Sequence, residues 1–220
     1  MSRDEKSPAR GLRDKLIGAK QRWAREGRLL TGKAGRDRLP PGQRLVEGRP
    51  VLDLGIQPEI PLEQWRLRID GLVRAPQVLD WQAFRKLPQI ERISDIHCVT
   101  SWSRYDNRWS GVAAKTVIER AGPLPEARFA VLHSEDGYTT NLPLAALLDD
   151  DVLLAHSWDG APLEREHGAP VRLVVPKRYF WKSAKWVRRI ELLSHDRPGF
   201  WEERGYHNEG DPWEEERYSW

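Results

Sequence analysis

The chain of 220 residues contains a single cysteine, Cys98. A disulfide, a cysteine-based zinc site and an iron–sulfur cluster each need two or more thiolates, so this chain supplies none of them. The fold must therefore rest on a hydrophobic core, and a chain of this length buries a substantial one. A lone cysteine among apolar neighbours is usually a small buried hydrophobe. Its sequence context decides whether Cys98 has a chemical role.

Charge and hydropathy exclude several classes of protein. The 36 lysines and arginines nearly balance 33 aspartates and glutamates, and the 11 tryptophans are not interleaved with a basic stripe, so we expect no nucleic-acid partner. No apolar run approaches the roughly 20 residues of a membrane helix, so we expect no integral membrane segment. Residues 1–6 lack the apolar stretch of a secretory signal, which predicts a cytoplasmic protein.

The sequence predicts one large domain with an N-terminal extension. Residues 1–34 are basic and favour a helix, either laid on the body of the protein or lying on a membrane surface. Residues 35–220 form the predicted domain, which begins with a loop rich in proline and glycine over 36–63. From residue 194 onward the aromatic side chains are too frequent for disorder, so we expect this C-terminal segment to pack on the domain.

Short strands mixed with short helices argue for an α+β domain. Apolar alternation and turn residues predict strands over 65–69, 90–96, 129–134, 152–155, 171–175 and 185–193, and a hairpin turn at Asp159-Gly160. Helices are predicted over 112–121, 142–148 and the stretch from an Asp80 N-cap to Leu87. This arrangement places Cys98 at the end of the strand over 90–96.

The sequence around Cys98 and a later block carry a family resemblance. Cys98 lies within residues 96–103 and precedes Trp109-Ser110-Gly111-Val112. The later block reads Gly160-Ala161-Pro162-Leu163, His167-Gly168-Ala169-Pro170-Val171-Arg172-Leu173-Val174-Val175-Pro176, Tyr179 and Trp181-Lys182-Ser183-Ala184-Lys185-Trp186. These motifs resemble the molybdopterin-binding domain of the sulfite oxidase family, especially the single-domain bacterial branch that includes methionine sulfoxide reductases. The resemblance implies mixed sheets with short helices and a molybdenum–molybdopterin cofactor.

The resemblance also implies which residues hold that cofactor. Cys98 matches the family's only protein ligand to molybdenum, and a thiolate suits a metal already bound by the sulfurs of the pterin. His167 with Arg172, and Ser183 with Lys185, match two pairs that bind the cofactor. Arginine and lysine supply positive charge for its phosphate, and serine supplies a hydroxyl. One further residue, Ser134, aligns with another cofactor-contacting position.

The predicted substrate side of the site leaves alternatives open. Tyr138 matches the family's tyrosine near the metal, where it would hydrogen-bond a substrate oxygen or carry a proton; the alternative is a turn tyrosine that packs its ring. Trp102 and Trp109 are either pocket walls or core residues. The catalytic residues that the resemblance implies are therefore Cys98 and Tyr138.

One departure from the family decides the expected substrate. Sulfite oxidases follow their cysteine with Gly-Asn-Arg-Arg, whereas this chain has Thr100-Ser101-Trp102-Ser103-Arg104, with Arg108 as the next arginine. Because a sulfite dianion needs paired positive charge, we expect oxygen-atom transfer that reduces small S-oxides or N-oxides rather than oxidising sulfite. The chain has no haem or iron–sulfur motif, so its electrons are expected to be exchanged with a separate electron-transfer protein.

Two other classes of function compete with this prediction. The first is a non-catalytic, tryptophan-rich protein-binding module in which Cys98 is only a buried structural residue. The second is a cysteine hydrolase that needs a histidine beside Cys98. The adjacent His97 would point to the opposite side of a strand, which argues against the hydrolase.

Overall fold

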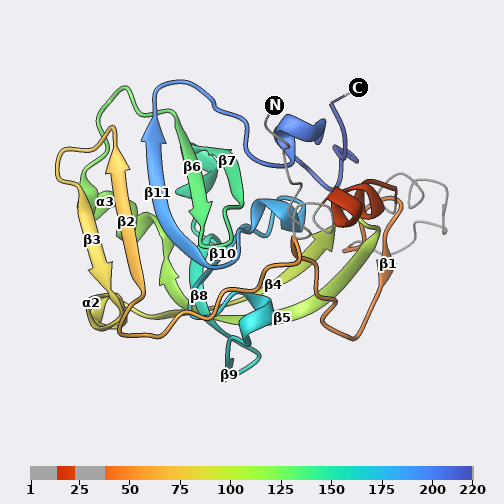
Figure 1. Cartoon of the computed structure of the whole chain (residues 1–220), viewed down its shortest axis with the longest axis horizontal. Helices are drawn as coiled ribbons and strands as arrows, with labels where there is room; N and C mark the ends of the chain where they lie inside the picture. The colour runs from red at the N-terminus through yellow and green to blue at the C-terminus, as the bar shows by residue number, and fades with distance from the viewer. Residues whose placement is uncertain (1–13, 23–37, 220) are drawn as a thin grey trace, which may run out of the picture.

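Two mixed β-sheets form the framework of the described structure. The computed structural model describes residues 14–22 and 38–219 (Figure 1). The first sheet has the order β1-β5-β8-β10, with β4 also paired to β5 and β9 to β8. Its strands are β1 (Arg44–Leu45), β4 (Ile90–Cys98), β5 (Trp102–Ala113), β8 (Leu153–Trp158), β9 (Ala161–Pro162) and β10 (Arg172–Val174). The longest pairing joins β4 and β5 in antiparallel register, with Cys98 opposite Trp102.

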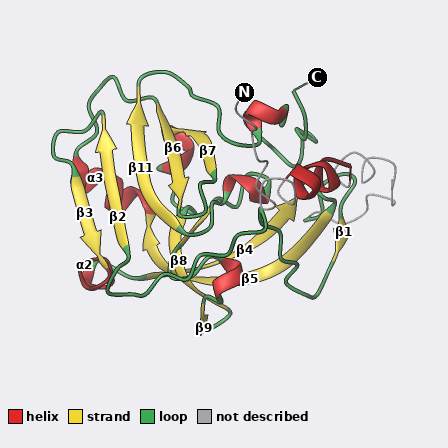
Figure 2. Cartoon of the chain, in the orientation of Figure 1, coloured by secondary structure: helices red, strands yellow, loops and turns green. Residues whose placement is uncertain are grey.

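The second sheet has the order β3-β2-β11-β6-β7. Its strands are β2 (Arg66–Gly71), β3 (Gln77–Asp80), β6 (Phe129–Ser134), β7 (Thr139–Pro143) and β11 (Val187–Leu193). The helices are short, as Figure 2 shows: α2 (Trp81–Lys86), α3 (Ala114–Ala121), α4 (Leu144–Leu147) and 3-10 turns at Arg165–His167, Phe180–Lys182 and Glu202–Arg204. The predicted α+β class is therefore correct.

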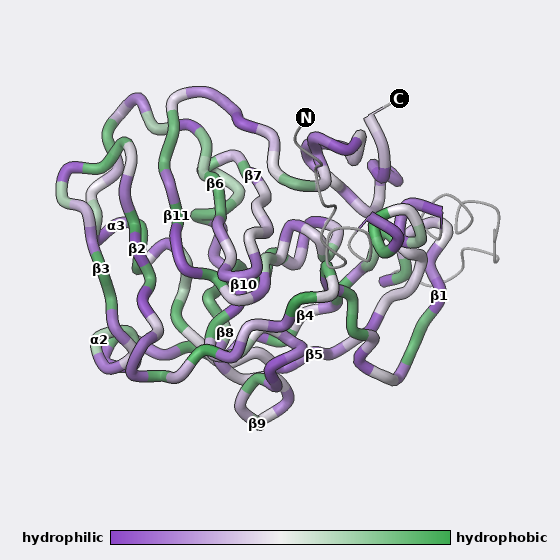
Figure 3. The backbone as a smooth tube through the Cα atoms, in the orientation of Figure 1, coloured by the Kyte–Doolittle hydropathy of each residue, from purple (hydrophilic) through white to green (hydrophobic). Residues whose placement is uncertain are grey.

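The hydrophobic core lies between the two sheets. Helix α3 contacts β2 of one sheet and β5 and β8 of the other, and its four apolar side chains at Ala114, Val117, Ile118 and Ala121 are buried. Figure 3 shows apolar stretches along β6 and β8, while many connecting loops are polar. No helix among the described residues is both long and apolar enough to cross a membrane.

Most of the predicted strands and helices are present. Two helices begin two residues later than predicted, and both differences have the same physical reason. The strands that contain 66–69, 90–96 and 129–134 are present, and the Asp80 carboxylate accepts a hydrogen bond from the Ala83 N–H at the start of α2, at 2.7 Å. Residues 112–113 belong to β5 and residues 142–143 to β7, not to helices. Both pairs are held by long-range ladders, to β8 and β6. Pairing between distant strands overrides local helix preference.

The helix over residues 14–22 and the C-terminal segment are in contact, because the Tyr218 hydroxyl donates to the Gln21 carbonyl at 3.1 Å. Residues 14–22 are helical, and the rest of the predicted extension over 1–34 lies outside the described residues. The C-terminal segment contacts the rest of the chain: the ring of Tyr206 lies 5.1 Å from that of Trp181 between centroids, and Trp201 stacks on Tyr206 at 4.8 Å. Glu202 forms a buried ion pair with Lys182 at 2.6 Å. These contacts fix the C-terminal segment against the sheets.

Gly111 lies where strand β5 passes close to the backbone of β8. A Cβ atom at this position would lie 2.0 Å from the carbonyl oxygen of Leu154 and 2.8 Å from the Cα of Ala155. The register of the two strands also shifts between Ser110 and Gly111. Any side chain at this position would push the backbones of β5 and β8 apart, which explains the glycine in the Trp-x-Gly motif.

We expect Gly111→Ala to lower the free energy of unfolding by about 1–3 kcal/mol, because the added methyl group overpacks a backbone contact. Urea unfolding followed by circular dichroism measures the change. The control is Gly48→Ala, where a Cβ atom meets nothing within 4 Å. A similar decrease in the free energy of unfolding in the two variants would contradict the proposed close contact.

Candidate cofactor pocket

Six of the seven predicted site residues line one pocket. They come from five places in the fold: the end of β4, the turn between β6 and β7, the 3-10 turn at Arg165–His167, strand β10 and the segment before β11. The six are Cys98, Tyr138, His167, Arg172, Ser183 and Lys185. Ser134 is not among the lining residues. Its buried hydroxyl oxygen has no hydrogen-bond partner among the residues that the structure describes.

Cys98 ends strand β4 with its thiol in the pocket. Its Sγ lies 3.1 Å from the Thr100 hydroxyl oxygen, and its carbonyl accepts a hydrogen bond from the Gln43 side chain at 3.0 Å. Burial raises the pKa of the thiol above its ordinary value, and the hydroxyl of Thr100 partly offsets this effect. The positive charges of Lys20 and Arg217 oppose it further. A bound soft metal would displace the proton, because metals bind the thiolate form.

His97 does not contact the Cys98 thiol. Its Nδ1 is hydrogen-bonded to the Ser103 hydroxyl at 2.8 Å, and its ring meets the edge of Trp213 at 6.3 Å between centroids. Burial lowers the pKa of His97 to about 4, so the ring is neutral. His97 is therefore not placed as a base for Cys98, which argues against the cysteine hydrolase that the sequence left open.

Arg172 is a buried cation without a carboxylate partner among the described residues. Its guanidinium donates to the carbonyls of His167 and Ser183, both at 3.0 Å, and lies over the Phe180 ring at 4.2 Å. Burial lowers its pKa to about 9. Carbonyl dipoles and a ring face orient this group but leave its charge uncompensated, and a buried unpaired charge is costly.

Lys185 adds a second, partly buried cation to the same end of the pocket. Its ammonium donates to the Glu166 carbonyl at 2.8 Å and lies 3.8 Å from the Asp53 carboxylate. Burial, and then the charge of Arg172, lower the pKa of Lys185 to about 7. The Ser183 hydroxyl accepts from the Val175 N–H at 2.9 Å, so its own proton is available to a ligand. These groups fit a phosphate, which would supply the missing negative charge.

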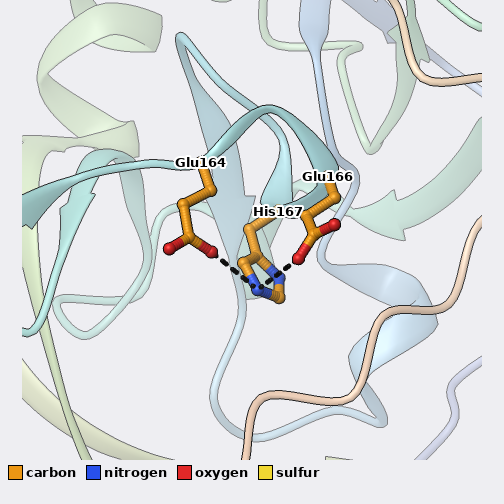
Figure 4. Close-up of side chains that lie close together, drawn as sticks. All are labelled: Glu164, Glu166 and His167. Atoms are coloured by element: carbon orange, nitrogen blue, oxygen red, sulfur yellow. Dashed lines mark ion pairs between the residues drawn. The ribbon is translucent and has the colours of Figure 1, made fainter.

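His167 lies beside Arg172, whose guanidinium donates to its carbonyl, and Figure 4 shows its ring next to two glutamates. Its Nε2 is 3.3 Å from a Glu164 carboxylate oxygen and 3.7 Å from one of Glu166. Burial, and then the charge of Arg172, lower its pKa to about 4. The two glutamates are exposed, and exposed acidic groups commonly surround a histidine without a metal. We therefore assign no second metal to this trio.

Tyr138 lines the pocket, but its hydroxyl is already engaged. It donates a hydrogen bond to the Trp181 carbonyl at 2.6 Å, and its ring packs 6.0 Å from that of Phe200. Burial raises the pKa of Tyr138 well above its ordinary value, so the phenol is neutral. Its role with a substrate stays a prediction, and the hydroxyl would have to leave this carbonyl to donate elsewhere.

The aromatic and basic residues that follow Cys98 in the sequence differ in whether they line the pocket. Trp102 lines the pocket, whereas Trp109 is fully buried and stacks on Trp158 at 4.6 Å. Arg104 pairs with Asp159 at 2.8 Å, and neither Arg104 nor Arg108 is a lining residue. The arginines that follow Cys98 in the chain therefore contribute no charge to the pocket wall.

Three charged lining residues were missed by sequence reasoning: Lys20, Asp53 and Asp136. They lie in the N-terminal helix, the proline-rich loop and the turn after β6. Their residue types carry no motif, and no local signal could have found them. Together with Arg172 and Lys185 they leave the lining with three cations and two carboxylates, an excess of positive charge.

A buried thiol and an excess of positive charge around one pocket fit an anionic metal cofactor. Residues 54–201 match the family described as the oxidoreductase molybdopterin binding domain, so the chain belongs to this family of molybdopterin-binding oxidoreductases. The predicted family and cofactor are therefore confirmed. Membership argues against the alternative of a non-catalytic binding module.

The relatives include proteins of different length. The chain is 47% identical over 184 residues to the uncharacterized oxidoreductase YuiH of Bacillus subtilis, covering 83% of this chain and 93% of that protein. It is 34% identical over 155 residues to the protein-methionine-sulfoxide reductase catalytic subunit MsrP of Gluconobacter oxydans, covering 62% of this chain and 49% of that protein. The match thus spans about half the length of the named sulfoxide reductase.

A solved structure supports the fold. The sulfane dehydrogenase SoxCD from Paracoccus pantotrophus aligns with a TM-score of 0.59 at 24% identity, covering 63% of this chain and 40% of that chain. At this identity the likeness shows the fold alone. The mixed sheets with few short helices agree with it.

Proposed function

We propose that this protein reduces small S-oxides or N-oxides by oxygen-atom transfer at a molybdenum–molybdopterin cofactor. The observation that carries the proposal is the pocket itself, in which the Cys98 thiol and the cations Arg172 and Lys185 line one cavity. The relative named as a methionine-sulfoxide reductase catalytic subunit supports the same reaction class. Electrons would be exchanged with a separate redox protein, and the cytoplasmic location stays a prediction.

Each end of the pocket has a proposed task. When bound, the cofactor supplies a metal that changes oxidation state as an oxygen atom moves to or from the substrate. Cys98 would hold the metal, and the cations at positions 172 and 185, with the Ser183 hydroxyl, would hold the phosphate. The low exposure of these groups limits the access of water. Hydrogen bonds to backbone partners or to a neighbouring side chain fix their orientation.

The substrate preference follows from the wall near Cys98. Trp102, Phe180 and Trp181 line the pocket, whereas the arginines that follow Cys98 in sequence do not. Apolar rings suit a neutral S-oxide with an apolar body. A compact dianion such as sulfite would lose its hydration without paired guanidinium groups to replace it.

We therefore expect the molybdenum-loaded protein to reduce dimethyl sulfoxide or trimethylamine N-oxide with an artificial electron donor, with a higher kcat/KM than it shows for sulfite oxidation. Steady-state assays of one preparation on the three substrates measure this ratio. Efficient sulfite oxidation without detectable S-oxide or N-oxide reduction would falsify the proposed direction.

Metal analysis tests the cofactor assignment independently of the substrate. Protein purified from cells that make the cofactor should contain about one molybdenum atom per chain. A molybdenum-free protein with a normal melting temperature would overturn the proposed function.

A further inference from the structure

A third cation enters the pocket from outside the region that matches the family. Lys20 lies on the helix over residues 14–22, is only 9% exposed and lines the same pocket as Cys98 and Lys185. Its ammonium forms no hydrogen bond or ion pair with the residues that the structure describes. Long lysine side chains normally carry their charge to water. Lys20 instead holds it inside a cavity.

Specific contacts hold this helix over the pocket. Leu16 lies against Gly55, where a Cβ atom would be only 2.8 Å from the leucine Cδ1. Ile17 packs on the hydrophobic core, and the Tyr218 hydroxyl donates to the Gln21 carbonyl at 3.1 Å. Figure 1 shows the helix, drawn in red, beside the C-terminal segment. The position of Lys20 is therefore set by docking of the helix on two different parts of the chain.

The acidic neighbours of Lys20 do not compensate its charge by direct contact. Asp53 contributes most to its electrostatic stabilisation, but its carboxylate accepts hydrogen bonds from the Gly55 N–H and the Gln57 side chain, both at 2.8 Å. The next contributions come from Cys98 and Asp136. Burial outweighs these charges and lowers the pKa of Lys20. An anion in the pocket would relieve the cost of keeping the ammonium buried.

We propose that Lys20 is an anion-binding residue of this pocket, and that the helix over 14–22 delivers it there to bind an oxyanion of the occupant. The oxyanion is either the phosphate of the cofactor or an acid group on the S-oxide substrate. The inference rests on the proposed function for the identity of the occupant, but the positive charge inside the cavity does not depend on it. Lys20 would thus supply part of the charge that Arg104 and Arg108 do not.

The variants Lys20→Met and Lys20→Arg test this role, with Lys15→Met as the matched control, because Lys15 is an exposed lysine on the same helix. Metal analysis after prolonged dialysis measures cofactor retention. Steady-state kinetics compares KM for (methylsulfinyl)acetate, which is anionic, with KM for neutral dimethyl sulfoxide. Thermal denaturation of cofactor-free protein with inorganic phosphate tests anion binding without any turnover.

Two results support the proposal and distinguish the source of the anion. If the cofactor is the ligand, Lys20→Met should retain about 10- to 100-fold less molybdenum at equilibrium, the loss expected for one charge-assisted hydrogen bond. If a substrate acid group is the ligand, molybdenum content should stay constant and KM should rise by a similar factor for the anionic S-oxide alone. In both cases Lys20→Arg should keep molybdenum retention and KM close to the wild-type values, because it keeps the positive charge. Lys15→Met should match the wild type in both quantities.

The inference is overturned if Lys20→Met matches Lys15→Met in molybdenum retention, in the ratio of the two KM values and in stabilisation by phosphate. A merely structural role would change melting temperature without changing these three quantities. Failure of the proposed function has a different signature: the wild type would lack molybdenum, while phosphate would still stabilise it more than it stabilises Lys20→Met.

Discussion

Cys98→Ser is expected to abolish turnover while the protein stays folded. Serine preserves the shape of the side chain, but its hydroxyl is a harder and far less acidic ligand than a thiol, so it holds molybdenum poorly. The polar contacts of the thiol are with Thr100, whose hydroxyl oxygen lies 3.1 Å from the sulfur, and a serine hydroxyl can also make them. We therefore expect a change of no more than about 1–2 kcal/mol in the free energy of unfolding. Activity with an artificial donor, molybdenum per chain and thermal denaturation measure the three effects.

Thr100→Val is the control for this experiment. It removes the hydroxyl that contacts the Cys98 sulfur and leaves the proposed ligand in place. We expect this variant to keep its molybdenum and much of its turnover. Wild-type activity in Cys98→Ser would exclude Cys98 as the metal ligand, and equal losses in the two variants would point to general disruption of the pocket.

Much of the proposed site was readable from the sequence because its residues lie in compact motifs. His167 and Arg172 lie five positions apart, and Ser183 and Lys185 lie two apart. The 3-10 turn, strand β10 and the segment before β11 bring both pairs into one pocket. Cys98 was predicted at a strand end and lies there. Short spacing constrains geometry when the intervening backbone is held by neighbouring strands.

Lys20 shows what the sequence did not reveal. It lies 78 residues before Cys98, on a helix whose place depends on Leu16 meeting Gly55 and on a hydrogen bond from Tyr218. No local pattern encodes such contacts among a helix, a loop and a residue near the C-terminus that are far apart in the sequence. The same reason explains the missed strand β5, whose serines, arginines and tryptophans show no simple alternation and whose pairing partners β4 and β8 are distant.

Lys185 gives a prediction with opposite signs for the cofactor-free and the cofactor-loaded protein. In cofactor-free protein the Lys185 ammonium is buried, with a pKa of about 7 against an ordinary value of about 10.4. A base whose pKa is lowered by folding destabilises the fold while it is protonated. The free energy of unfolding of the cofactor-free protein should therefore rise as the pH rises from about 7 to about 10.

Lys185→Met should weaken this pH dependence and raise the stability of the cofactor-free protein below about pH 10, because it removes a largely buried charge. In the loaded protein the same change should lower molybdenum retention by about 10- to 100-fold, since a charge-assisted contact with phosphate is lost. Arg172→Ala should share the loss of retention. It should also destabilise the cofactor-free protein, because the carbonyls of His167 and Ser183 lose their donors.

Metal analysis after dialysis measures cofactor retention, and urea unfolding at several pH values measures stability. The control is Lys177→Met, which changes an exposed lysine outside the pocket. Turnover per bound molybdenum should change little in Lys185→Met, because a phosphate ligand lies away from the reacting atoms. If that quantity collapses while retention is normal, Lys185 acts on the substrate and the phosphate assignment is wrong. Opposite effects on the empty and the loaded protein are expected only if the buried charge serves a ligand.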